Sequence, residues 1–320
     1  MSKQCTPKTT PQKTTPRKKD DSLLKSAFQE AFPELLRFYF PEADAIFDIE
    51  RGIEFLDKEL GELFPERQKP GGTRFVDMLV KAFLKDASEE WILVHIEIQG
   101  GRTGNFAFRM LQYWYRIFDR FQVNISALAV FTGGRGQKRP EHFHKCFLGT
   151  EINYRYNVYH ILDHTEGELL AMDNPFALIV LAAQKALFAH KVPEKELGEQ
   201  RLMLARAMIA SKRYDHEKIM HFLYFLKNFI YVENPEINLN FDNEINLLTG
   251  NQNAMGIIET IKKIEREEGR EEGREEGREE GREESVVNLL KADKFTVPEI
   301  ANFANVTQAF VKKVKRKLKA

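Results

Sequence analysis

The fold is decided by two neighbouring stretches, residues 74–80, RFVDMLV, and residues 91–99, WILVHIEIQ. In both, single polar residues interrupt an apolar run rich in β-branched and aromatic side chains, which indicates β-strands. The polar segment 85–89, KDASE, falls between strands expected at 74–84 and 90–99. So short a polar connection predicts a hairpin, in which the two strands are antiparallel neighbours.

Each strand carries one acidic residue, Asp77 in the first and Glu97 in the second. Because side chains alternate along a strand, His95 and Gln99 share the face of Glu97. Two carboxylates brought to one point offer the hard oxygen ligands that suit Mg²⁺, which can activate water and steady a phosphate. The alternative is a sheet end with solvated or ion-paired carboxylates, although an unpaired charge inside the apolar strand of Glu97 would be costly.

The next segment, 103–121, is expected to be a helix that continues this polar theme. Arg109, Tyr113 and Arg116 recur at helical spacing and therefore lie on one face. Arg109 is either a surface cation or a phosphate ligand, and Tyr113 is either a core residue with a wet hydroxyl or a group that orients water. A second stripe is expected in the core: Phe106, Met110 and Trp114.

Together these motifs resemble the recombination-promoting nuclease/transposase (Rpn-type) family of the PD-(D/E)XK nuclease superfamily. The resemblance rests on Asp77, on H-x-E-x-Q at 95–99 and on R-x-x-x-Y at 109–113, and it extends over residues 22–245. It implies an α/β fold with a restriction-endonuclease-like core, in which helices flank a mixed sheet and further helices follow. It also implies a Mg²⁺-dependent endonuclease that hydrolyses phosphodiester bonds of DNA, and a homodimer would suit two-ended cutting.

The resemblance also implies a role for each motif residue. It gives three metal ligands, Asp77, Glu97 and the backbone carbonyl of Ile98, and three residues that position groups around the ion: Gln99, Arg109 and Tyr113. Gln99 stands where the superfamily has Lys, so a neutral amide replaces a cation that would stabilise developing negative charge. Lys81, on the strand face of Asp77, is a candidate source of that charge. Val76 stands where the superfamily has Pro. These departures support an alternative function, a catalytically inactive nuclease fold that binds DNA or a protein.

Composition bounds these expectations. The chain has 320 residues, 42% of them hydrophobic, which suffices for one large domain and an appendage. Its formal net charge is +0, so nucleic-acid binding cannot rest on overall positive charge. The two cysteines, Cys5 and Cys146, give no disulfide framework and favour a reducing compartment. Without an apolar run near ~18 residues or a signal-peptide core, the protein is expected in the cytoplasm and away from membranes.

Four segments are expected along the chain. Residues 1–21, rich in Thr, Pro and Lys, form a disordered basic tail, and residues 22–250 form the nuclease-like domain. Residues 251–284 form a helical spacer of Arg-Glu-Glu-Gly repeats, which lacks the apolar seam of a coiled coil. Residues 285–320 form a small module that resembles DNA-binding helix-turn-helix tails. The alternative for this module is a helical hairpin that contacts protein.

Local signals place further elements. Ser22 is expected to cap a helix over 23–32, and Pro33 to start the next turn. Other expectations are a short helix and loop at 52–66, a strand buried on both faces at 125–131, a strand at 151–162 and mostly helix over 175–250. In the tail, Thr296 and Glu299 predict a capping box, Asn305 a turn and Thr307 the cap of a last helix. That helix carries the cations Lys312, Lys313, Lys315, Arg316, Lys317 and Lys319.

Overall fold

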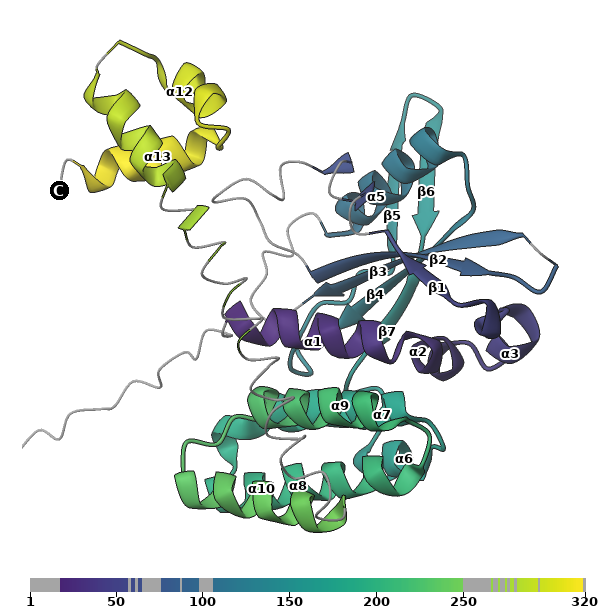
Figure 1. Ribbon diagram of the computed structural model, residues 1–320. Helices are drawn as coiled ribbons and strands as arrows, with labels where there is room; N and C mark the ends of the chain where they lie inside the picture. The colour runs from purple at the N-terminus through teal and green to yellow at the C-terminus, as the bar shows by residue number, and fades with distance from the viewer. Residues whose placement is uncertain are drawn as a thin grey trace, which may run out of the picture.

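A computed structural model describes residues 18–56, 59–60, 63–64, 76–86, 88–97, 106–249, 266, 270, 274, 277–278, 281–292 and 294–318 (Figure 1). Its centre is a five-stranded mixed sheet of strand order β1-β2-β3-β4-β7. The strands are β1 (Ile53–Phe55), β2 (Val76–Phe83), β3 (Glu89–Glu97), β4 (Ile125–Phe131) and β7 (Asn157–His160). β1, β2 and β3 pair antiparallel, whereas β3, β4 and β7 pair parallel. The predicted hairpin of β2 and β3 and the predicted strand at 125–131 are confirmed.

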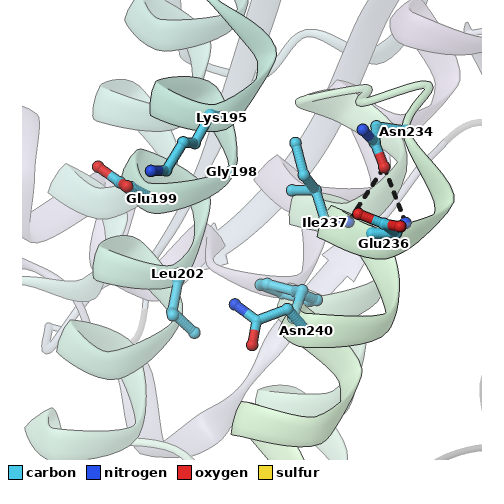
Figure 2. A pocket seen from close by; sticks show the side chains of 9 residues that line it. Lys195, Gly198, Glu199, Leu202, Asn234, Glu236, Ile237 and Asn240 are labelled. Atoms are coloured by element: carbon cyan, nitrogen blue, oxygen red, sulfur yellow. Dashed lines mark hydrogen bonds between the residues drawn. The ribbon is translucent and has the colours of Figure 1, made fainter.

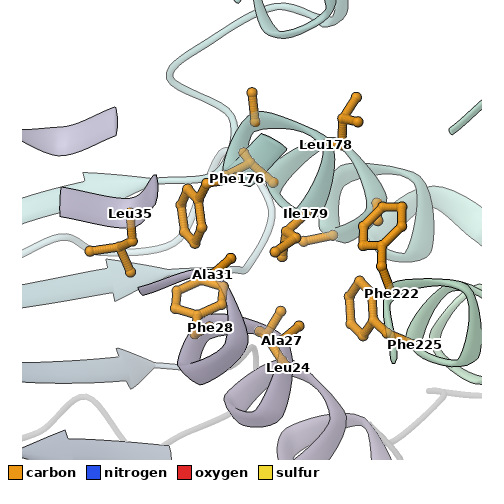
Figure 3. Close-up of a cluster of buried hydrophobic side chains, with 14 of the residues drawn as sticks. Leu24, Ala27, Phe28, Ala31, Leu35, Phe176, Leu178, Ile179, Phe222 and Phe225 are labelled. Atoms are coloured by element: carbon orange, nitrogen blue, oxygen red, sulfur yellow. The ribbon is translucent and has the colours of Figure 1, made fainter. Parts of the chain in front are cut away.

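Helices cover both faces of the sheet, as the apolar run of β4 predicted. Leu128 and Val130 belong to the larger cluster with α1 (Lys18–Glu30), α2 (Phe32–Tyr39) and α7 (Pro175–Phe188), part of which is drawn in Figure 3. Ala127 and Ala129 belong to the second cluster, with α5 (Phe106–Phe121). Because successive residues of a strand point to opposite faces, one apolar strand supplies both cores.

The chain from Glu166 to Leu248 is mostly helical, as predicted for 175–250. It comprises α6 (Glu166–Ala171), α7, α8 (Glu194–Ser211), α9 (His216–Phe229) and α10 (Pro235–Leu248). Asn174 fixes the start of α7, since its Oδ1 accepts from the Phe176 N–H at 2.8 Å, and Pro175 suits the first turn. The Asn174 amide also donates to the Glu34 carbonyl at 2.9 Å, which joins α7 to α2.

Three local predictions were wrong. α1 begins at Lys18, so Ser22 lies within that helix and does not cap it, and residues 18–21 are not a tail. Residues 52–66 were predicted to be a short helix and a loop, but this segment begins with strand β1. The strand expected at 151–162 is two strands, because the chain leaves one sheet for another at Tyr156. β6 (Thr150–Arg155) pairs with β5 (His142–Phe147) in a separate ribbon, and β7 joins the main sheet.

The C-terminal module has its own small core. Val286, Ile300, Val306, Val311 and Val314 are among its buried residues. α12 (Val297–Phe303) begins with the predicted capping box, and α13 (Gln308–Lys317) with the predicted cap at Thr307. Asn305 turns the chain at φ 50°, as predicted. Residues 1–17, most of 251–280 and residues 319–320 lie outside the described part of the chain. Among the described helices, none combines the length and the apolar character that crossing a bilayer requires.

Candidate functional site

The two predicted acids occupy neighbouring strand positions. Asp77 of β2 is paired with His95 of β3, and β3 ends two residues later at Glu97. Leu79 and Leu93 belong to the α5-side cluster, and strand alternation places positions 77 and 97 on that same face. Diagonal positions of this kind are roughly 7–8 Å apart. The side chains of Asp77 and Glu97, and both Ile98 and Gln99, lie outside the described part of the chain.

Position 97 also lies at the carboxyl ends of parallel strands. Glu97 is paired with Phe131 of β4, and Phe131 with His160 of β7. In open α/β sheets, ligands bind beyond the carboxyl ends of parallel strands. The row from position 77 to His160 is therefore the place in this fold where a substrate site is expected.

Arg109 reaches this row from the first turns of α5. Its Nη2 lies 3.3 Å from Nε2 of His95, the residue paired with Asp77, and the His95 ring is fully buried. A guanidinium can only donate, so Nε2 accepts and the neutral His95 carries its proton on Nδ1. The guanidinium also lies 5.1 Å from the ring centroid of Phe106. A cation therefore stands beside the strand pair that holds the first acid.

Tyr113 and Arg116 have different surroundings. Tyr113 is buried in the α5-side cluster, with its ring centroid 4.3 Å from that of Phe64 and 6.2 Å from that of His95. Arg116 donates to the Leu63 carbonyl at 3.3 Å, away from this row. Arg109 and Tyr113 thus both lie at His95, a contact that their helical spacing alone did not predict, and Arg116 does not join them.

The predicted core stripe of α5 was wrong at one position. Phe106 and Met110 are buried as expected, but Trp114 is only half buried and stacks on Phe118 at 5.1 Å. The reason is that Tyr113 and Ile117 complete the buried face of the helix.

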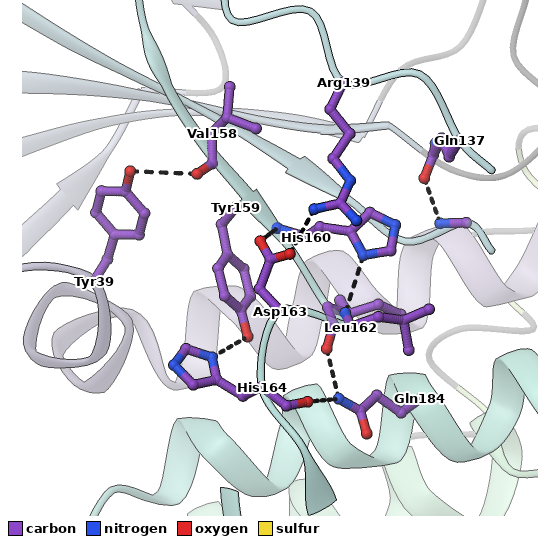
Figure 4. A network of polar contacts seen from close by, with 12 residues as sticks. Tyr39, Gln137, Arg139, Val158, Tyr159, His160, Leu162, Asp163, His164 and Gln184 are labelled. Carbon is purple, nitrogen blue, oxygen red and sulfur yellow. Dashed lines mark hydrogen bonds and ion pairs between the residues drawn. The ribbon is translucent and has the colours of Figure 1, made fainter. Parts of the chain in front are cut away.

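Figure 4 shows a polar network at the end of β7 that sequence reasoning missed. His160 is fully buried, and its Nδ1 accepts from the Leu162 N–H at 3.0 Å. Asp163 accepts from the His160 N–H at 2.9 Å and pairs with Arg139. Burial, and next the nearby Arg139 cation, lower the pKa of His160, so this imidazole is neutral at pH 7. Only its place at the end of an apolar strand could have signalled it.

The Gly-rich loop before β5 is held in place at both ends. The Gly133 N–H donates to Oε1 of Gln137 at 2.6 Å, and a Cβ at Gly133 would meet that oxygen at 2.6 Å. At the other end Arg139 is fixed by Asp163, while Arg135 and Lys138 are exposed. The loop therefore presents two solvated cations from a fixed turn near the ends of β4 and β7.

Other candidate groups lie elsewhere. Lys81 pairs with Glu54 at 3.5 Å and opposes Trp91, four residues along β2 from Asp77, so it does not supply the charge that Gln99 lacks. The segment 142–146, HFHKC, spaces two His and one Cys as a metal site would, but its His144 pairs with Glu151 at 3.0 Å. Across the part of the chain that the structure describes, no three His, Cys, Asp or Glu side chains gather as metal ligands would.

A groove of about 370 Å³ lies between α8 and α10 (Figure 2). Its lining is mixed: apolar Leu202, Ile237 and Phe241 alternate with polar groups such as Lys195 and Glu199. The helices that form it pack with the larger cluster, whereas Arg109 and His95 lie with α5. This groove is therefore separate from the candidate site.

Comparison of the chain with protein-family models, with curated proteins and with solved structures found no match.

Proposed function

We propose that this protein is a Mg²⁺-dependent DNA endonuclease of the recombination-promoting nuclease/transposase type, with a PD-(D/E)XK-like core, that acts in the cytoplasm. The observation that carries the proposal is the register of β2 and β3. It sets positions 77 and 97 diagonally on one face of the sheet, at the edge where the parallel strands β3 and β4 end. Two acids so placed are the minimal arrangement for a metal-assisted phosphodiester hydrolase.

The donor chemistry at these positions fits the ion. Asp and Glu carboxylates and a backbone carbonyl are hard oxygen ligands, which Mg²⁺ prefers to nitrogen or sulfur. Asp77, Glu97 and the Ile98 carbonyl would hold it, and when bound it would lower the pKa of a coordinated water and offset phosphate charge.

The remaining roles belong to the chain's own side chains. Arg109 is already oriented by His95 at 3.3 Å, and its planar guanidinium can donate two parallel hydrogen bonds to a phosphate. Tyr113 packs beside His95 and limits how far that ring can turn. The Gln99 amide can donate to a phosphate oxygen or hold a water, although it carries no charge.

The C-terminal module supports DNA as the partner. In α13, Val311 and Val314 are buried, while Lys312, Lys313 and Lys315 are exposed. Cations on the outer face of a capped helix can contact phosphates and can follow a groove. The chain thus carries a basic helical face although its net charge is +0.

A second candidate is a catalytically inactive nuclease fold that binds DNA or a protein. The observation that favours it is Gln99 in place of Lys, together with the engagement of Lys81 by Glu54. This candidate predicts that DNA is retained but not cut.

The test is cleavage of supercoiled plasmid with Mg²⁺ or with EDTA. Asp77→Asn and Glu97→Gln remove one ligand charge each with little change in side-chain size. We expect each to reduce cutting about 10²–10³-fold, the range for removing one charge-stabilising group from an active site. Glu54→Gln is the matched control, because Glu54 is an exposed carboxylate of the same sheet that faces Lys81. Equal cutting by wild type and both site variants would refute the assignment. DNA retention without Mg²⁺-dependent cutting would favour the binding module.

A further inference from the structure

The ribbon of β5 and β6 has a largely apolar face, which the described part of the chain covers only at its base. The register places three pairs on this face: Phe143 with Tyr154, Lys145 with Ile152 and Phe147 with Thr150. At the base, Phe143 lies 5.2 Å from Phe108 and Tyr154 lies 5.7 Å from Trp114, measured between ring centroids. The ribbon is therefore anchored on α5 through its first pair, as its position beside α5 in Figure 1 also shows.

Beyond this anchor the apolar side chains face solvent. Ile152 is 44% exposed, Phe147 70% and Leu148 89%. An isolated two-stranded ribbon is at best marginally stable in water, and it needs packing on its apolar face. The outer half of the ribbon lacks such packing within the described chain.

The turn at the tip displays a leucine at a conformational cost. Leu148 has φ 46° and Gly149 has φ 81°, so both central residues are left-handed, as in a type I′ turn. That turn favours Asn-Gly, because a side chain without a local hydrogen bond is strained at positive φ. The Leu148 side chain is almost fully exposed, so it adds no burial that would stabilise the fold. Strain kept at an exposed tip points to a binding role.

The outer side of α5 extends the same surface. Phe108, Tyr115 and Phe118 are 37%, 57% and 38% exposed, and their spacing places them on one side of the helix. With Phe147, Leu148 and Ile152 they form what we term the ribbon patch. At about 200 Å² per large side chain, the patch exposes roughly 650 Å². The largest apolar patch of a typical monomer is about 300–600 Å².

We propose that the ribbon patch is the interface at which two copies of this chain pair about a two-fold axis. Burying the patch on both copies removes about 1,300 Å² from water, which falls within the range of specific interfaces. In such a pairing the same surface meets itself, so a charged patch would repel its copy. On the ribbon, Lys145 is the charged residue of this face, because Glu151 pairs with Cys146 and therefore lies on the opposite face. One exposed cation per copy is screened by salt and is a weak source of repulsion between two such patches.

The same charges argue against DNA as the occupant. An arm that inserts apolar side chains between base pairs relies on flanking cations that contact phosphates. Here the ribbon part of the patch offers one cation, Lys145, because Glu151 and His144 lie on the opposite face and pair with each other at 3.0 Å. One cation gives few phosphate contacts, so a second apolar surface suits the patch better than DNA.

The experiment measures the mass of the full-length protein by sedimentation equilibrium, without DNA or metal, so that the result does not depend on cleavage. We expect the wild type to be dimeric at micromolar concentration. Phe147→Asp combined with Leu148→Asn should raise the dimer dissociation constant at least about tenfold, because a charge enters the interface twice. Leu247→Asp, on α10, is the matched control, since Leu247 is also exposed, at 69%, and lies outside the patch.

Ile152→Lys provides a second test in case the tip variant fails to fold, and it should weaken the dimer in the same direction. A wild type that is monomeric at about 100 μM, where specific interfaces of this size are formed, would overturn the proposal. So would a dissociation constant unchanged in Ile152→Lys and in the tip variant. A monomer whose tip variant loses DNA affinity would overturn it in favour of a DNA-contacting ribbon.

Discussion

Arg201 gives the most quantitative test of how this fold is stabilised. The side chain is fully buried between α8 and α10, where one nitrogen donates to Oδ1 of Asn238 at 2.8 Å. The guanidinium lies 4.4 Å from the ring centroid of Phe241, and the other two nitrogens have no hydrogen-bond partner within the described chain. Burial lowers the pKa of Arg201 to about 10. At 1.36 kcal/mol per pKa unit, holding this charge in the folded state costs roughly 3 kcal/mol.

Two substitutions separate the charge from its hydrogen bond. Arg201→Met removes the cost of roughly 3 kcal/mol, but it also removes a charged hydrogen bond worth about 1.5–3 kcal/mol and a ring contact worth about 1 kcal/mol. The terms nearly cancel, so the free energy of unfolding should change by less than about 1 kcal/mol. Asn238→Leu leaves the cation in place without its acceptor and should cost about 3 kcal/mol.

The assay is urea unfolding at pH 7 followed by circular dichroism. Arg206→Met is the control on the same helix, because Arg206 is half exposed where it pairs with Glu244, and it should cost below about 1 kcal/mol. If Arg201→Met proves more destabilising than Asn238→Leu, the buried cation is a net contributor to stability and the reasoning above is wrong.

Two further predictions concern pH and salt. The Glu30 carboxylate, 3.0 Å from the imidazole of His221, raises the pKa of His221 above 6.5, and the same hydrogen bond lowers the pKa of Glu30 below 4.5. The pair therefore stabilises the fold fully between about pH 4.5 and 6.5, and this is lost as pH rises through the raised pKa or falls through the lowered one. In His221→Gln, thermal stability should lack this pH dependence. The change in the free energy of unfolding should be less than about 1 kcal/mol, because both groups are partly exposed. A variant with the pH profile of the wild type would contradict the assignment. Removing 285–320 should weaken DNA binding and reduce the slope of log K against log salt by up to about 4. This counts one phosphate contact for each exposed cation described on α13: Lys312, Lys313, Lys315 and Arg316. Identical affinity and slope for full-length protein and 1–284 would reassign the module to protein contacts.

The parts of the fold that sequence predicted are those fixed by local pattern. The apolar side chains of 91–99 and 125–131 predict strands whatever surrounds them in the fold. Thr296 and Glu299 predict a helix start because they hydrogen-bond to each other. The failures arise where distant residues decide. Tyr156 ends one strand because its ring is buried beneath α5, and no local signal marks that exchange between sheets.

The candidate site shows the same division. Alternation and hairpin spacing were enough to place Asp77 and Glu97 on one face, and helical spacing placed Arg109 and Tyr113 on one face of α5. The contact of both with His95 came from the structure. His160 escaped notice because a single histidine in an apolar strand has the same pattern whether it is core or site. His160 lies beside Phe131 because β7 pairs parallel with β4. The whole β5–β6 ribbon separates these two strands in the sequence, so no local pattern predicts their pairing.

The packing of α1 against α9 also determines when α1 can be fully buried during synthesis. Glu30 and His221 are 191 residues apart in the chain, and Phe28 lies 4.9 Å from Phe176, measured between ring centroids. At roughly 5–20 residues per second, a ribosome needs about 10–40 s to reach α9 after completing α1. Phe28 can contact α7 earlier in that interval, but the cluster that buries Leu24 and Phe28 is complete only once α9 has been made. The first helix of this domain is therefore the segment that a chaperone acting on nascent chains has longest to bind.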